Sequence, residues 1–249
     1  MAKVKGLLQF YGTIDGVNLY RLEGENVARK AKSISKKKYK TAPNYASFRD
    51  AGKEMGSAAK MSSAFRNPLK IYTNGIAENR MYSRVNALMR KLILLDSISL
   101  RGERTVANGI ATAEGKELIN NFEFNMHKSL VQTLQCGYIL DVVTGTFQVL
   151  DFSPKKDLKS PVGATHVGMQ LLCYDFDFAT KNYQLNVSEP EMIALEEDSV
   201  SLDLCVSDLP DVIGTRMYLL RILFYQEVNG VFSTLQGNHN GLVTVLEVI

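Results

Sequence analysis

The sequence contains no tryptophan, and only three of its 249 residues are cysteines. Cys136, Cys173 and Cys205 are an odd number at wide spacing, which fits neither a disulfide framework nor a zinc motif. Free cysteines of this kind favour a reducing compartment. The three histidines are scattered, without the spacing of a metal site. We therefore expect neither a metal nor another cofactor.

Long apolar runs are also absent. No run approaches the ~18 residues that a membrane-spanning helix needs. The N-terminus is basic, but neither the apolar segment nor the cleavage site of a signal peptide follows it. We therefore expect a chain without a membrane span or a signal peptide, cytoplasmic at synthesis, either free or as part of a larger particle.

Catalytic and nucleotide-binding motifs are missing as well. The chain contains neither of the Gly-rich phosphate-binding patterns, GxGxxG and GxxxxGK[ST], nor the GxSxG motif of serine hydrolases. Acidic residues do gather in one segment, but a glycosidase needs two carboxylates at a separation that a framework holds constant. These absences predict a binding or structural protein rather than an enzyme.

Acidic residues are scarce in the first part of the chain. Residues 1–104 contain 21 basic and 8 acidic residues, a net charge of +13, whereas residues 105–249 contain 8 basic and 18 acidic residues, a net charge of −10. Such asymmetry indicates a polyanion partner or a contact between unlike halves of two copies. The alternative is that the opposite charges meet within one monomer.

Two segments concentrate this charge. The basic segment, which lacks any acidic residue and is predicted to contact a polyanion or another subunit, contains Arg29, Lys30, Lys32, Lys36, Lys37, Lys38, Lys40 and Arg49. The acidic segment, predicted to be the counter-surface, contains Glu189, Glu191, Glu196, Glu197 and Asp198. A lysine run without paired arginines or a stacked aromatic series does not indicate readout of nucleic-acid bases.

The first half of the chain predicts short strands followed by two helices. Asp15-Gly16 is typical of a type I′ hairpin turn, in which glycine readily adopts positive φ. Apolar residues at helical spacing predict helices at about Tyr45–Leu69 and Ile76–Leu95, with Pro68 ending or kinking the first. The two helices would form an antiparallel hairpin whose apolar seam is buried within the monomer or against another chain.

The second half predicts an antiparallel β-sandwich. Thr105–Lys116 is rich in Ala, Gly and Thr and is interpreted as a boundary segment. After it, seven to nine apolar strand candidates alternate with turn signals such as Asn229-Gly230. The predicted fold class is therefore α+β, with a basic β-hairpin and two-helix domain at residues 1–104 and an acidic antiparallel β-sandwich domain at residues 105–249.

Several short motifs resemble those of a known family. They include Lys5-Gly6, Gly12-Thr13-Ile14 followed by Tyr20, Arg101-Gly102-Glu103-Arg104, and Phe224-Tyr225-Gln226-Glu227-Val228-Asn229-Gly230. Together they resemble a family of uncharacterised proteins of Bacteroidota genomes that have about this length. The resemblance spans most of the chain and implies a shared fold, without a known activity.

Three functions are compatible with these patterns. The first is a structural protein that assembles into a homo-oligomer, such as a filament, tube, sheath or virion-like component, by docking the basic half of one copy on the acidic half of another. The second is sequence-independent nucleic-acid binding through the basic segment. The third, with the weakest support, is a small-ligand or catalytic site around Asp175, Asp177 and His166, where the two acids are expected to point outward from a strand.

Overall fold

The computed structural model describes residues 2–3, 11–31, 34–76, 78, 80–209, 211–235, 237 and 240–249. The chain consists of two compact units, Met1–Arg49 and Asp50–Ile249, called here the N-terminal unit and the C-terminal unit. The division therefore falls after Arg49 and not after Arg104 as predicted. The physical reason is that the helices beyond Asp50 share one hydrophobic core with the strands of the second half.

The N-terminal unit contains a small antiparallel sheet and a short helical segment. The sheet has the order β1 (Ala2–Lys3), β4 (Glu25–Lys30), β3 (Val17–Leu22) and β2 (Gly12–Ile14). Two-residue turns join β2 to β3 and β3 to β4, and Asp15 and Gly16 have φ of 45° and 76°. The predicted type I′ hairpin is confirmed. Helix α1 (Lys36–Thr41) and a 3-10 turn, η1 (Pro43–Tyr45), then lead to α2 (Ala46–Thr73).

The C-terminal unit contains two antiparallel sheets. The large one is built on β7 (His166–Phe176) and β11 (Thr215–Val228), which pair along their length. Its other strands are β8 (Tyr183–Val187), β9 (Glu191–Ala194), β12 (Val231–Thr234) and β13 (Gly241–Val248). The small sheet has the order β10 (Val200–Cys205), β6 (Thr146–Phe152) and β5 (Ile139–Asp141).

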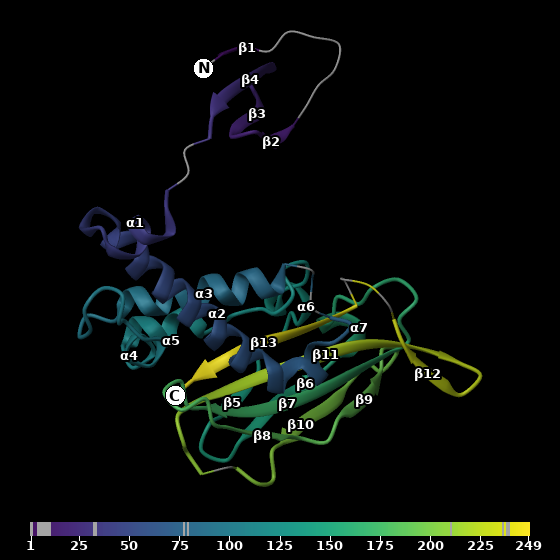
Figure 1. Cartoon of the computed structure of the whole chain (residues 1–249). Coiled ribbons are helices and arrows are strands. Elements are labelled where there is room, and N and C mark those ends of the chain that lie inside the picture. The colour runs from purple at the N-terminus through teal and green to yellow at the C-terminus, as the bar shows by residue number, and fades with distance from the viewer. Residues whose placement is uncertain are drawn as a thin grey trace. The chain divides into compact units, whose positions relative to one another are not determined.

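The large sheet is buried on both faces. Successive side chains of a strand point to opposite faces, and on β7 the odd-numbered Val167, Met169 and Leu171 join a core with the small sheet. The even-numbered Leu172 and Tyr174 join a second core with the helices. Figure 1 shows these helices over one face of the sheet. The α+β fold class is confirmed, and a helical layer is added to the two packed sheets.

The helical layer consists of α2, α3 (Met81–Leu95), α4 (Val106–Ile110) and α5 (Ala113–Ile119); the short helices α6 (Leu130–Thr133) and α7 (Pro154–Asp157) follow along the chain. The α3 seam is buried as predicted, and it packs within its own unit against the sheet. Helix α2 continues past Pro68 to Thr73, so of the two predicted outcomes, an end or a kink at Pro68, the end is wrong. Leu69, fully buried one residue after the proline, anchors this last part of the helix in the core.

Helices α4 and α5 occupy the segment that was interpreted as a boundary. Thr105 and Thr112 cap them by accepting hydrogen bonds from the Asn108 and Gly115 amides. A Cβ atom at Gly109 would lie 1.9 Å from the carbonyl oxygen of Leu92 on α3. The small residues of this segment therefore allow two helices to approach closely and are not a sign of a linker.

Candidate interaction surface

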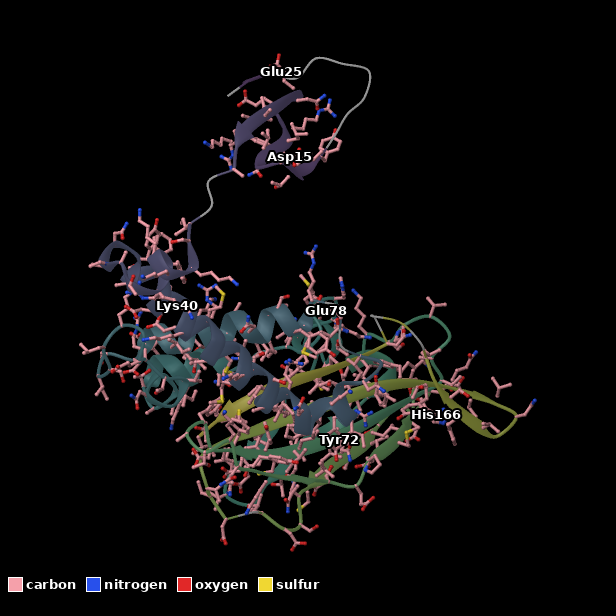
Figure 2. All side chains as sticks on the ribbon, viewed as in Figure 1. Asp15, Glu25, Lys40, Tyr72, Glu78 and His166 are labelled. Carbon is pink, nitrogen blue, oxygen red and sulfur yellow. The ribbon has the colours of Figure 1, made fainter. Side chains whose placement is uncertain are left out.

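The predicted lysine run lies on α1 of the N-terminal unit. The Ser35 side chain caps the helix by accepting a hydrogen bond from the Lys38 amide, at 3.2 Å. No residue of α1 is buried, so Lys36, Lys37, Lys38 and Lys40 are all exposed; Lys40 is labelled in Figure 2. Among the described residues, none forms an ion pair with these four lysines. Their charge is therefore available to an external anion.

Arg49, the last member of the predicted basic segment, has a structural role. Its Nη1 atom donates hydrogen bonds to the carbonyl oxygens of Tyr39 at 2.7 Å and Ala42 at 3.0 Å. These carbonyls lie at the C-terminal end of α1, where backbone acceptors lack partners within the helix. The guanidinium thus caps α1 and orients the lysines; it is less accessible to a ligand than sequence alone suggests.

An aromatic cluster that the sequence pattern does not predict lies beside the lysines. The ring centroids of Tyr39 and Tyr45 are 5.9 Å apart, and those of Tyr45 and Phe48 are 6.3 Å apart. Phe48 is 66% exposed. The three residues lie on α1, η1 and α2, so the break at Pro43 hides the cluster from any search for a single helical period.

The remaining basic residues of the segment lie on or after β4. Arg29 and Lys30 are exposed, and the Arg29 guanidinium lies 5.2 Å from the centre of the Tyr20 ring. Lys32 lies outside the described residues. Six of the eight predicted residues are therefore exposed cations of the N-terminal unit, two on β4 and four on α1, and Arg49 caps α1.

The predicted acidic segment belongs to the C-terminal unit and forms the end of one sheet edge. Glu191 is half-buried on β9, and its pKa is raised by burial and, to a smaller extent, by the charge of Asp203. The other four members, Glu189, Glu196, Glu197 and Asp198, are exposed. Part of the segment is a strand, because β9 pairs with β7 in a register that places Glu191 opposite Met169 and Met192 opposite Gly168.

Asp175, Asp177 and His166, the residues of the predicted small-ligand or catalytic site, do not form a site. Asp175 is fully buried, which contradicts the expected outward orientation; its Oδ1 accepts a hydrogen bond from the Gly214 amide at 2.8 Å, and Arg216 Nε lies 3.5 Å from its Oδ2. Asp177 closes a turn by accepting hydrogen bonds from Ala179 and Thr180. Asp175 and His166 lie near opposite ends of β7, about 30 Å apart at the rise of a strand.

A polar cavity of about 400 Å³ lies between the end of α2 and the start of α3. The charged groups there are largely satisfied within the protein. Arg66 lies 4.3 Å from the centre of the Tyr82 ring, and the buried Glu78, labelled in Figure 2, pairs with Arg84 at 2.8 Å and His127 at 3.7 Å. Within the described part of the chain, no three His, Cys, Asp or Glu side chains gather as a metal site.

A second cavity of about 400 Å³ lies between the start of α2 and the end of α3. Apolar side chains, including Met55 and Leu94, line it together with a set of cations, Arg90, Lys91, Arg101 and Arg104. Arg104 makes a two-pronged ion pair with Glu54, at 2.8 and 3.1 Å. The Arg104 hydrogen bond is the largest influence on the Glu54 carboxyl and lowers its pKa.

Asp96 organises the loop that follows α3 and carries Arg101 to this cavity. Its Oδ1 accepts hydrogen bonds from the Ile98 and Ser99 amides at 3.0 Å, and its Oδ2 accepts from the Thr105 amide at 2.9 Å. The Asn108 side chain donates to Oδ2 as well. Burial acts to raise the pKa of Asp96, but these hydrogen bonds outweigh it and hold the pKa well below its ordinary value of 3.8.

We expect Asp96→Ala to lower the free energy of unfolding by about 2–3 kcal/mol at pH 7, because three partly buried amides lose a charged acceptor. A carboxyl whose pKa is lowered by folding adds stability above its unfolded pKa, and this stability is lost as the pH falls through the lower folded value. The difference between the two proteins should therefore shrink below about pH 4. Urea unfolding followed by circular dichroism at pH 7, 5 and 3 measures it; a difference that does not change with pH would contradict this role.

The fold and this surface define an α+β protein with a basic, exposed N-terminal unit. No protein-family model matches the chain, and no curated protein or solved structure is significantly similar to it. No helix within the described residues is long and apolar enough to span a bilayer. Function is therefore inferred from the chain's own residues.

Proposed function

We propose that this protein is a non-enzymatic structural protein that self-associates, with the basic half of one copy, residues 1–104, docking on the acidic half of the next, residues 105–249. A contact between two different surfaces repeats from copy to copy, so it builds a ring or an open filament. The proposed product is a filament, tube, sheath or virion-like component.

The observation that carries the proposal is the exposed apolar surface of the N-terminal unit. Among its described residues, Val27 is the only buried hydrophobic side chain, while Tyr11, Ile14 and Leu22 are exposed. A few short strands need a further layer to bury an apolar face. A neighbouring copy would supply that layer, and β2, at the edge of its sheet, is suited to such pairing.

The distribution of charge also supports a second copy of the chain as the partner. The N-terminal unit contains 11 basic and 3 acidic residues, and the four α1 lysines form no ion pair with a described residue. The acidic segment keeps four exposed carboxylates on the C-terminal unit. Opposite charges on two surfaces of the same chain steer unlike surfaces together and keep like surfaces apart.

Size-exclusion chromatography with light scattering, across a salt series, tests the proposal. We expect a large, concentration-dependent species at low salt that dissolves at about 0.5 M salt or above, because exposed charges are then screened. Changing Lys36, Lys37, Lys38 and Lys40 to Glu should leave a monomer. The matched control changes Lys60, Lys155, Lys156 and Lys181 to Glu and should still assemble. A wild-type monomer at every salt concentration would overturn the proposal.

The aromatic cluster beside the lysines favours one second candidate, a sequence-independent single-strand binder. Lysines would contact phosphates, and exposed rings such as Tyr39 and Phe48 would stack on bases, which contributes about 1–3 kcal/mol per base. An oligonucleotide arm of the same salt series distinguishes the two functions. Retention of DNA or RNA with a steep salt slope supports this candidate, and its absence at low salt excludes it.

A further inference from the structure

We infer that the cavity between α2 and α3 is the receptor for the acidic segment of a second copy. This cavity is called here the helical groove, and it is lined by Ala51, Glu54, Met55, Ala87, Arg90, Lys91, Ile93, Leu94, Arg101 and Arg104. The inference rests on the proposed self-association and names a specific contact within it. It assigns a role to a surface outside the basic segment at Arg29–Arg49.

The charge of the groove is one-sided. Glu54 is the acid of the lining, and it is already occupied by Arg104 and by the Gly102 amide, which donates at 2.8 Å. In the described part of the chain, no acid pairs with Arg90, Lys91 or Arg101. Three positive charges thus surround a partly apolar hollow, which suits a segment that combines carboxylates with an apolar side chain.

The loop beside the groove displays apolar side chains in a defined conformation. Ile98 is 83% exposed and Leu100 is 77% exposed, and they precede the groove residue Arg101 by three residues and one residue. The backbone that carries them is held by the hydrogen bonds of the buried Asp96 carboxylate. Ordered, exposed apolar residues next to unpaired cations are typical of an interface that is covered by a partner.

The acidic segment has the complementary composition. Glu196, Glu197 and Asp198 are consecutive exposed acids, and Met192, on the preceding strand β9, is 41% exposed. The three carboxylates match in number the three groove cations that have no ion pair with a described residue, Arg90, Lys91 and Arg101. Because groove and acidic segment are different surfaces, each copy still offers one of them after pairing, as continued assembly requires.

A mixing experiment with charge-reversed full-length chains tests the contact. The groove variant is Arg90→Glu/Lys91→Glu, and the acid variant is Glu196→Lys/Glu197→Lys. Each alone should need about tenfold or higher concentration to form the large species, since like charges then face one another. Mixed together, the normal groove of the acid variant meets the normal acidic segment of the groove variant, and the two reversed surfaces are complementary to each other as well. We therefore expect the large species to reappear by light scattering, with the two chains present in equal amounts.

Combining all four changes in one chain provides the strongest check. The charges are then complementary again with reversed polarity, so large assemblies should reappear. Lys60→Glu/Arg80→Glu, with the same charge change on the same helical region, is the control and should assemble as wild type does.

Two failures can be told apart. A wild-type protein that is monomeric under all conditions would contradict both the proposed function and the groove contact. A groove variant that assembles like wild type, while the variant with four α1 lysines reversed does not, would leave self-association in place and reject the groove. A mixture of the two variants that does not regain the large species would also reject it.

Discussion

Arg216→Met is expected to lower the free energy of unfolding by about 3–5 kcal/mol, because it leaves a buried carboxylate without its cation. Asp175 is fully buried between the two sheets of the C-terminal unit, and Arg216 Nε lies 3.5 Å from its Oδ2. The Gly214 amide satisfies Oδ1 alone. Urea unfolding, followed by circular dichroism and tyrosine fluorescence since the chain has no tryptophan, measures the loss.

A double variant shows whether the missing charge is the cause. Replacing both partners, as Asp175→Leu/Arg216→Met, removes the buried charge altogether and should recover most of the lost stability. If Arg216→Met costs less than about 1 kcal/mol, or if the double variant is no more stable than the single one, the ion pair is not what compensates Asp175.

Phe65→Ala is the second change with a large expected effect, about 3–5 kcal/mol of unfolding free energy. Phe65 is 1% exposed, and its ring centroid lies 5.5 Å from that of Tyr174, 5.6 Å from Phe176 and 5.8 Å from Phe178. The Tyr174 hydroxyl also donates to the Phe65 carbonyl at 2.9 Å. The substitution therefore opens a cavity where α2 meets the large sheet.

Phe48→Ala is the matched control, since it removes the same ring from the same helix. Phe48 is largely exposed, so its loss should change the free energy of unfolding by no more than about 0.5 kcal/mol. Equal effects of the two substitutions would mean that α2 does not pack on the sheet through Phe65.

The two substitutions with large expected effects, Arg216→Met and Phe65→Ala, also allow stability to be measured separately from assembly. Phe65→Ala and Arg216→Met act on buried groups and should lower stability at any protein concentration. Reversing the charge of exposed residues such as Lys91 or Glu196 should change assembly while leaving the unfolding of the C-terminal unit nearly unchanged.

Local physics made part of this fold predictable. Asp15-Gly16 and Asn229-Gly230 form turns with positive φ, as expected from residues that adopt this backbone conformation at low cost. The α3 seam from Met81 to Leu92 is buried because its period matches that of a helix with one apolar face. The α+β class and the antiparallel pairing follow from such short-range patterns.

Long-range packing decided the features that sequence reasoning placed differently. Gly109 looked like part of a linker, but its missing Cβ is what lets α4 approach α3. Asp175 looked like an outward acid on an alternating strand, but both faces of the large sheet are covered, so alternation no longer separates inside from outside. The domain boundary moved to Arg49 for the same reason, since α2 and α3 complete the core of the sheet.

The sequence by itself therefore determined the hairpin turns, the strongly periodic elements such as α3 and the uneven distribution of charge, because each depends on neighbouring residues or on composition. Only the tertiary structure decided which charges stay accessible. In the folded protein, Arg49 caps the end of α1 and Arg104 pairs with Glu54, whereas the α1 lysines, Arg90 and Lys91 are exposed. A charge takes part in binding only if no partner within the fold has already neutralised it, and that partner can lie anywhere along the chain.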